Sequence, residues 1–405
     1  MTRDAWLLFG TRFVRLFAYG SLSVVLVFYL ISIGLDERET GVLLTLTLAG
    51  DTVVSLLLTT QADRIGRRRV LIAGSALMVA AAVVFASTRA VWLLFIAGTV
   101  GVLSPSGNEV GPFLPIEQAA LSQIVADRDR TRVLALYTLV GSFATAIGAL
   151  ATGLAMRGLE AIGTSPPQRY RAIVVLYGAI GVVLAAAFLR LSRRSEAQPG
   201  AQTRPLTMIG RLSGLEQSRG VVLKLSALFS LDAFAGGFVI QSFAAYWFYL
   251  RFGIDPAALG TIFFWANVFA GLSALLASRL AARFGLIETM VATHIPSNVL
   301  LMLVPVMPTL RLAVLVLLAR FSISQMDVPT RQSYLTAVVP PEERSAAAGI
   351  AGVARTVGAA VSPVFVGYLF ARPSLVNLPF FIAGALKITY DLLRYRSFRN
   401  RAAAT

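Results

Sequence analysis

Carboxylates inside long apolar runs are the side chains of this chain best suited to chemistry. Asp51 lies in LTLAGDTVVSLL and Asp232 in LFSLDAFAGG. Glu109 follows Asn108 in SPSGNEVGP. Pro and Gly in this segment interrupt a helix and leave backbone groups without hydrogen bonds, and inside a membrane such irregular backbone belongs beside a cavity. A charge at a bilayer centre costs at least about 2.5 kcal/mol, so each carboxylate is a functional candidate. Asp51 is interpreted as a proton carrier, and the alternative is a structural hydrogen bond to a neighbouring helix.

Basic side chains also lie inside apolar runs, at Arg320 and Arg355. Asp327 follows Arg320 by seven residues, which is two helical turns on the same helix face. Arg320 is therefore expected to pair loosely with Asp327 or with an anionic substrate. Arg12 and Arg15 enter the first apolar run, and we interpret them as snorkelling to the membrane interface.

The composition shows what surrounds these side chains. The chain has 405 residues, of which 57% are hydrophobic and only 14% charged, with a mean hydropathy of +0.74. Soluble domains carry roughly 25% charged residues, so lipid must be the outer solvent here. The net charge of +16 lies in short gaps between apolar runs, which argues against nucleic-acid binding. With no Cys and one His, His294, no metal or other cofactor is expected.

The apolar runs predict an all-α membrane protein with twelve transmembrane helices. Residues 1–191 are expected to form one six-helix bundle, 192–221 a cytosolic linker, and 222–405 a second six-helix bundle. The helices are predicted near residues 12–35, 40–62, 70–88, 91–123, 131–156, 172–191, 222–250, 256–280, 289–307, 310–338, 345–371 and 374–393.

The two halves read as repeats, which predicts two pseudo-equivalent bundles around a central cavity. Residues of the first half recur 219 positions later up to Gly66 and 214 positions later from Pro115 onward, so the first half holds five extra residues, which we place in SPSGNEVGP. Glu117 and Arg331 occupy equivalent positions with opposite charges. We expect them to form an inner gate across the two halves.

The segment ADRIGRRRV, 62–70, resembles the signature loop of the major facilitator superfamily, whose pattern is roughly G-x-x-x-D-R-x-G-R-R. Thr59 stands where the pattern prefers Gly. In that family the loop latches the two halves in one state, so the resemblance implies a gating motif. The residues that match are Asp63, Arg64, Gly66, Arg67 and Arg68.

The resemblance implies a secondary transporter that moves a small-molecule substrate by alternating access, and not an enzyme. We expect coupling to protons, with efflux ahead of uptake, in a monomer whose other partner is membrane lipid. One alternative is a proton symporter or facilitator that imports a small organic or anionic solute. Another is a non-transporting membrane sensor built on the same fold.

Basic residues concentrate in alternate gaps, which predicts a multi-pass protein of the cell (inner or plasma) membrane with both termini in the cytosol. A reporter enzyme that is active only in the cytosol is expected to be active when it is fused after Thr405. Activity of a reporter that works only outside the cytosol would contradict this orientation.

Overall fold

The structure is a computed structural model, and it describes all residues except 1, 193–194, 197–214, 216–217, 341–342 and 399–405. Within the described residues all regular secondary structure is helical, and ten helices are long and apolar enough to cross a membrane. The all-α membrane fold predicted from composition is therefore confirmed. Most of the predicted linker 192–221 lies outside the described residues.

The first of two compact units comprises residues 1–203 and 240–264, as far as they are described. In it α1 packs on α6, α7 and α10, α3 packs on α7, and α2 packs on α4. Residues 240–264, which the sequence analysis assigned to the second bundle, thus make their contacts here. The helices are α1 Arg3–Ser32, α2 Glu37–Ile65, α3 Arg67–Ser87, α4 Val91–Val100, α5 Phe113–Ile124, α6 Asp127–Ala161, α7 Pro166–Phe188, α10 Gln241–Phe252 and the start of α11 Pro256–Phe284.

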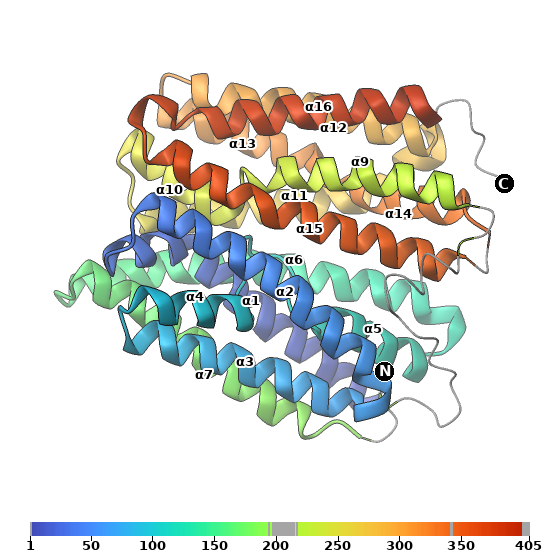
Figure 1. Cartoon of the computed structure of the whole chain (residues 1–405), viewed down its shortest axis with the longest axis horizontal. Helices are drawn as coiled ribbons and strands as arrows, with labels where there is room; N and C mark the ends of the chain where they lie inside the picture. The colour runs from blue at the N-terminus through green and yellow to red at the C-terminus, as the bar shows by residue number, and fades with distance from the viewer. Residues whose placement is uncertain (1, 193–194, 197–214, 216–217, 341–342, 399–405) are drawn as a thin grey trace. The chain divides into compact units, whose positions relative to one another are not determined.

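The second unit comprises residues 204–239 and 265–405, again as far as they are described. Its most extensive contact joins α9 to α15, which run alongside each other in Figure 1. The helix α12 packs on α13, α14 and α16. The unit contains the rest of α11 with α9 Arg219–Gly237, α12 Leu286–Leu303, α13 Leu310–Ser324, α14 Asp327–Ala337, α15 Arg344–Phe370, α16 Leu378–Phe398 and two 3-10 turns, Val304–Val306 and Pro373–Leu375.

Equivalent helix starts carry the same local chemistry, as the sequence repeat predicts. Asp36 Oδ1 accepts the N–H of the residue three positions on at 2.7 Å, and Asp255 Oδ1 does the same at 2.8 Å. Gly66 and Gly285 both adopt positive φ, 108° and 92°, at the turns that follow α2 and α11. A side chain is strained in this conformation, so both turns require glycine.

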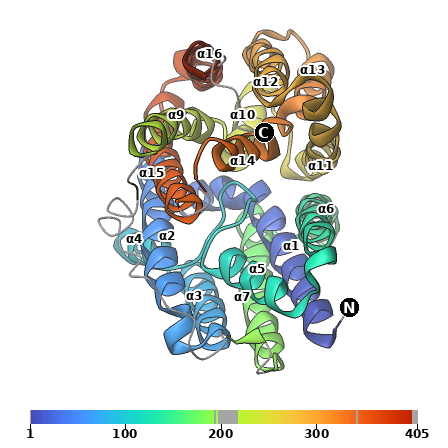
Figure 2. The same cartoon turned by 90° about the vertical axis from the view of Figure 1, so that its right-hand side faces the viewer.

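The helices expected over 91–123, 222–250 and 310–338 are each broken in two. The starts of α4 and α13 are 219 residues apart, whereas the starts of α5 and α14 are 214 apart. The five extra residues therefore lie between α4 and α5, where the sequence analysis placed them. The break after α13 is the short turn 325–326, but 101–112 form a long coil, which Figure 2 shows between α4 and α5.

This coil packs among helices that are long and apolar enough to span a membrane, where lipid would offer backbone groups no hydrogen bonds. Side chains from α1, α6, α7, α10 and the coil itself replace the missing partners. The donor–acceptor pairs are Tyr19 Oη to Val110 O (3.3 Å), Thr145 Oγ1 to Gly107 O (3.2 Å), Tyr177 Oη to Val102 O (2.6 Å), Ser242 Oγ to Pro105 O (2.6 Å) and Ser104 Oγ to Asn108 O (2.6 Å).

The helices α6 and α11 touch through glycines within the first unit. A Cβ added to Gly153 would lie 2.6 Å from the carbonyl oxygen of Ala257, and one added to Gly260 would lie 2.7 Å from Gly153 Cα. Small residues of this kind let membrane helices approach until their backbones meet. Here the backbones leave no room for a side chain.

Gly153→Leu is therefore expected to force α6 and α11 apart and to destabilise the protein by about 1–3 kcal/mol, the usual cost of overpacking. Gly158→Leu is the matched control on the same helix, because an added Cβ there has no atom within 4 Å. Thermal unfolding of the purified proteins measures the difference. Equal stability of the two variants would contradict the close approach.

Candidate functional site

An ion cluster on α1 organises the first unit. Arg15 donates two hydrogen bonds to Glu117, at 2.8 and 2.6 Å, and a third to Glu109 at 2.8 Å. Arg12 binds the other oxygen of Glu109 at 2.8 Å. Tyr137 on α6 also donates to Glu117. A fork of parallel bonds between guanidinium and carboxylate is the strong and directional form of an ion pair.

The interpretation of Arg12 and Arg15 as interfacial snorkelling side chains is wrong. The side chains of Arg15 and Glu117 expose no surface at all, and that of Arg12 is 7% exposed. Two arginines face two glutamates, so the charges of this cluster balance. The sequence signal was available in the spacing, because Arg12 and Arg15 are three residues apart and share a helix face.

Asp51 lies on α2 beside the coil and outside this cluster. The backbone N–H of Gly111 donates to Asp51 Oδ1 at 2.6 Å, and Ser55 Oγ donates to the same oxygen at 3.3 Å. In the described part of the chain Asp51 makes no ion pair. Asn108, in the same coil, has an exposed side chain.

A second ion cluster lies in the second unit around Asp232 on α9. Lys387 on α16 lies 2.6 Å from Asp232 Oδ1, and Arg331 on α14 lies 2.9 Å from Oδ2. Arg331 also lies 3.3 Å from Asp327. Asp232 and Asp327, both predicted as site residues, therefore share one arginine.

The same cluster extends to His294, Asp391 and Arg394. His294 Nδ1 lies 2.8 Å from Asp391 Oδ2, and Arg394 lies 3.1 Å from Asp391 Oδ1. A spacing of four residues favours a pair between Lys387 and Asp391, but Lys387 reaches Asp232 instead. Only the packing of α9, α12, α14 and α16 reveals this network, because its members are far apart in the sequence.

The two arginines predicted inside apolar runs stay outside this network. Asp327 pairs with Arg331, so the expected pairing of Asp327 with Arg320 is not formed. The Nε of Arg320 is buried without a hydrogen-bond partner, and the guanidinium lies 4.9 Å from the ring centre of Phe321. Arg355 on α15 is half-buried, and no ion pair forms to it among the described residues.

Glu117 and Arg331 both lie in the clusters of their own units. Glu117 binds Arg15, and Arg331 binds Asp232 and Asp327. Both units thus contain an ion pair between equivalent helices, but the positions of the acid and the base are exchanged. The first unit pairs an arginine on α1 with a glutamate on α5, and the second pairs an aspartate on α9 with an arginine on α14. An inner gate formed by Glu117 and Arg331 stays a prediction.

The signature loop joins α2 to α3, and Glu196 holds it in place. Asp63 accepts from Arg67 at 2.9 Å, while Arg64 and Arg68 are exposed. The carboxylate of Glu196 accepts the backbone N–H of Arg67 at 2.6 Å and that of Arg68 at 3.2 Å. A carboxylate at a helix N-terminus is stabilised by the helix dipole. Glu196 thus supplies the carboxylate at the start of α3, and sequence reasoning missed it.

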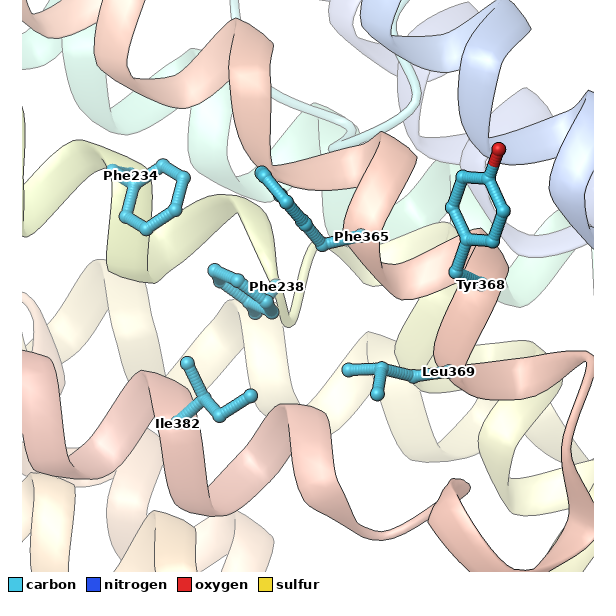
Figure 3. Close-up of a pocket in the computed structure, with 6 residues that line it drawn as sticks. All are labelled: Phe234, Phe238, Phe365, Tyr368, Leu369 and Ile382. Atoms are coloured by element: carbon cyan, nitrogen blue, oxygen red, sulfur yellow. The ribbon is translucent and has the colours of Figure 1, made fainter.

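A pocket of about 350 Å³ lies in the second unit between α9, α15 and α16. Figure 3 shows its aromatic lining. Phe238 and Phe365 stack at 6.3 Å between ring centres, and Phe234 meets Phe365 edge-on at 6.1 Å. The remaining lining residues are Tyr368, Leu369 and Ile382. This lining suits an apolar group and offers little to a charged one.

Clusters of three or more His, Cys, Asp and Glu side chains arranged to hold a metal ion do not occur among the described residues.

Comparison with known proteins matches a family model described as the Major Facilitator Superfamily to residues 8–250 and 225–402. An uncharacterized membrane protein of Saccharomyces cerevisiae, YJR124C, is 31% identical over 420 aligned positions, covering 97% of this chain and 93% of that protein. A point mutant of the nucleoside transporter NupG has a similar structure, with a TM-score of 0.79, 13% identity and coverage of 98% and 100% of the two chains. A bacterial homolog of the human lysosomal transporter Spinster also has a similar structure, with a TM-score of 0.71, 14% identity and coverage of 98% of each chain.

Glu117→Gln is expected to destabilise the protein by about 3–5 kcal/mol, because it removes the charge that neutralises the buried Arg15. Glu160→Gln is the matched control, since Glu160 is 57% exposed and its pair with Arg169 lies at the surface, where such pairs contribute about 0–1 kcal/mol. Unfolding of both purified variants gives the comparison. Equal losses of stability in the two variants would show that the buried pair of Arg15 with Glu117 matters no more than a surface pair.

Proposed function

The chain belongs to the major facilitator superfamily, and from this premise we propose that it is a proton-coupled secondary transporter. It moves a small solute across the membrane by alternating access. Asp51 carries the coupling proton, and efflux is the direction we propose.

The state of Asp51 supports this proposal more than any other observation. The other candidate carboxylates, Glu109, Asp232 and Asp327, each lie within 3.3 Å of an arginine or lysine nitrogen. Asp51 has only the N–H of Gly111 and the hydroxyl of Ser55. A carboxylate without a fixed cation can take up and release a proton at a smaller electrostatic cost than one held in an ion pair.

The hydrogen bond between Asp51 and the coil would let protonation of Asp51 change how firmly the coil is held. The bond from Gly111 N–H is a hydrogen bond to a charged acceptor when Asp51 is ionised, and it weakens when Asp51 is neutral. Gly111 is two residues from Glu109, which binds Arg12 and Arg15. Protonation of Asp51 would thus loosen the attachment of the coil at Gly111, while the ion cluster still holds the coil at Glu109.

Asp51→Asn preserves the shape of the side chain and removes its titration. In liposomes that contain the purified protein, the variant is expected to lose substrate accumulation driven by a pH gradient but to keep downhill exchange. Glu160→Gln, an exposed carboxylate changed in the same way, is expected to behave like the unaltered protein. Accumulation that persists in Asp51→Asn would assign the coupling to another group.

One further experiment identifies the substrate and the direction of transport. Cells with and without the gene are compared at two external pH values for the compounds they retain and release. The panel includes nucleosides, because NupG is a nucleoside transporter with a similar fold. Retention that falls when the gene is present supports efflux, whereas a rise supports the import of a solute by symport or facilitated diffusion.

We also propose that the signature loop gates transport. Asp63 and Arg67 form one pair, and Glu196 attaches the start of α3 to the segment that follows α7. Movement of this segment would then be transmitted to the loop between α2 and α3.

A further inference from the structure

The charges of the Asp232 cluster neutralise one another. The cluster has as many carboxylates as permanent cations, three of each. The carboxylates are Asp232, Asp327 and Asp391, and the cations are Arg331, Lys387 and Arg394. The cluster therefore has no carboxylate left over to neutralise another arginine.

Arg320 lies on the inward face of α13. The buried residues of this helix are Ala313, Leu317 and Ser324, spaced four and seven residues apart. Arg320 falls between Leu317 and Ser324 on the same stripe, three residues after one and four before the other. Exposed residues such as Leu315 lie on the other face, so Arg320 is directed toward protein.

Arg355 lies on the inward face of α15 by the same reasoning. It follows the buried Ala351 by four residues and precedes the buried Gly358 by three. A Cβ added to Gly358 would lie 2.3 Å from the carbonyl oxygen of Ser230, so this face packs directly on α9. Arg355 nevertheless forms no ion pair among the described residues, although Asp232 and Asp327 attract its charge and Arg331 repels it.

We infer that Arg320 and Arg355 provide the positive charge of a binding site for an anionic solute that carries a carboxylate or phosphate group. This inference rests on the proposed transport function and specifies its substrate class. Two permanent cations inside the spanning helices need negative charge, and no carboxylate among the described residues of the second unit forms an ion pair with either of them. Guanidinium groups bind carboxylates and phosphates through paired N–H donors, and the unpartnered Nε of Arg320 is one such donor.

The first test measures the empty protein, so it does not depend on knowing the substrate. Arg320→Gln and Arg355→Gln are expected to keep or raise the melting temperature, because each removes a charge that has no partner. Arg331→Gln is the contrasting variant and is expected to lower it, because Asp232 and Asp327 lose their shared cation. Arg320→Gln and Arg355→Gln variants as unstable as Arg331→Gln would overturn the inference.

The second test uses the compound that the cell comparison identifies, in liposomes of neutral phosphatidylcholine. That compound is expected to be an anion, and each Gln variant is expected to raise its KM roughly 10- to 100-fold, the loss typical of a hydrogen bond to a charged group. Arg320→Lys and Arg355→Lys keep the charge but lose the paired N–H donors, so their KM should lie between that of the unaltered protein and that of the Gln variants. Arg311→Gln, an exposed arginine on the same helix as Arg320, should change nothing.

Competition separates the two anion chemistries. Succinate and glycerol 3-phosphate are added as competing carboxylate and phosphate probes, with glycerol and uridine as neutral controls. A transported compound that is neutral or cationic, or an unchanged KM in both Gln variants, would overturn the inference. If the unaltered protein transports nothing, the proposed function fails, and the melting temperatures still decide whether the two arginines lack partners.

Discussion

Polar groups inside a bilayer must find their partners within the protein, and the coil between α4 and α5 meets this constraint in the least regular way. Its carbonyl groups depend on hydroxyls from α1, α6, α7 and α10. Its side chain Glu109 binds two arginines of α1, and its amide at Gly111 binds Asp51 on α2. The packing of the first unit therefore depends on a coil that stands where a continuous helix was expected.

The same constraint separates the buried charges into two classes. In the first class each charge has a fixed partner, as in the bidentate pair of Arg15 with Glu117 or the sharing of Arg331 by Asp232 and Asp327. Removing one member of such a pair leaves the other as an uncompensated buried charge, so single substitutions at these residues destabilise the protein. In the second class are Asp51, Arg320 and Arg355, which lack an ionic partner among the described residues. A protein that keeps such costly groups is expected to use them for a proton or a solute.

Local chemistry could be predicted from the sequence, and long-range pairing could not. The caps at Asp36 and Asp255 and the turns at Gly66 and Gly285 depend on residues close in the chain, and each pair occupies equivalent positions of the repeat. The partner of Lys387 depends on which helices meet, and helical spacing wrongly favours Asp391 over Asp232. Helical spacing also paired Arg320 with Asp327, and that pair does not form. Likewise, counting apolar runs does not separate α13 from α14, because only residues 325–326 lie between the two helices.

Infrared difference spectroscopy tests the central claim most directly, since the C=O stretch of a protonated carboxylic acid is separate from the bands of a carboxylate. Spectra of the purified protein in lipid are recorded across a pH series, with Glu160→Gln as a control for an exposed carboxylate. A buried carboxylic acid signal should appear and disappear with pH, respond to substrate, and be absent in Asp51→Asn. An unchanged titrating signal in Asp51→Asn would contradict the account.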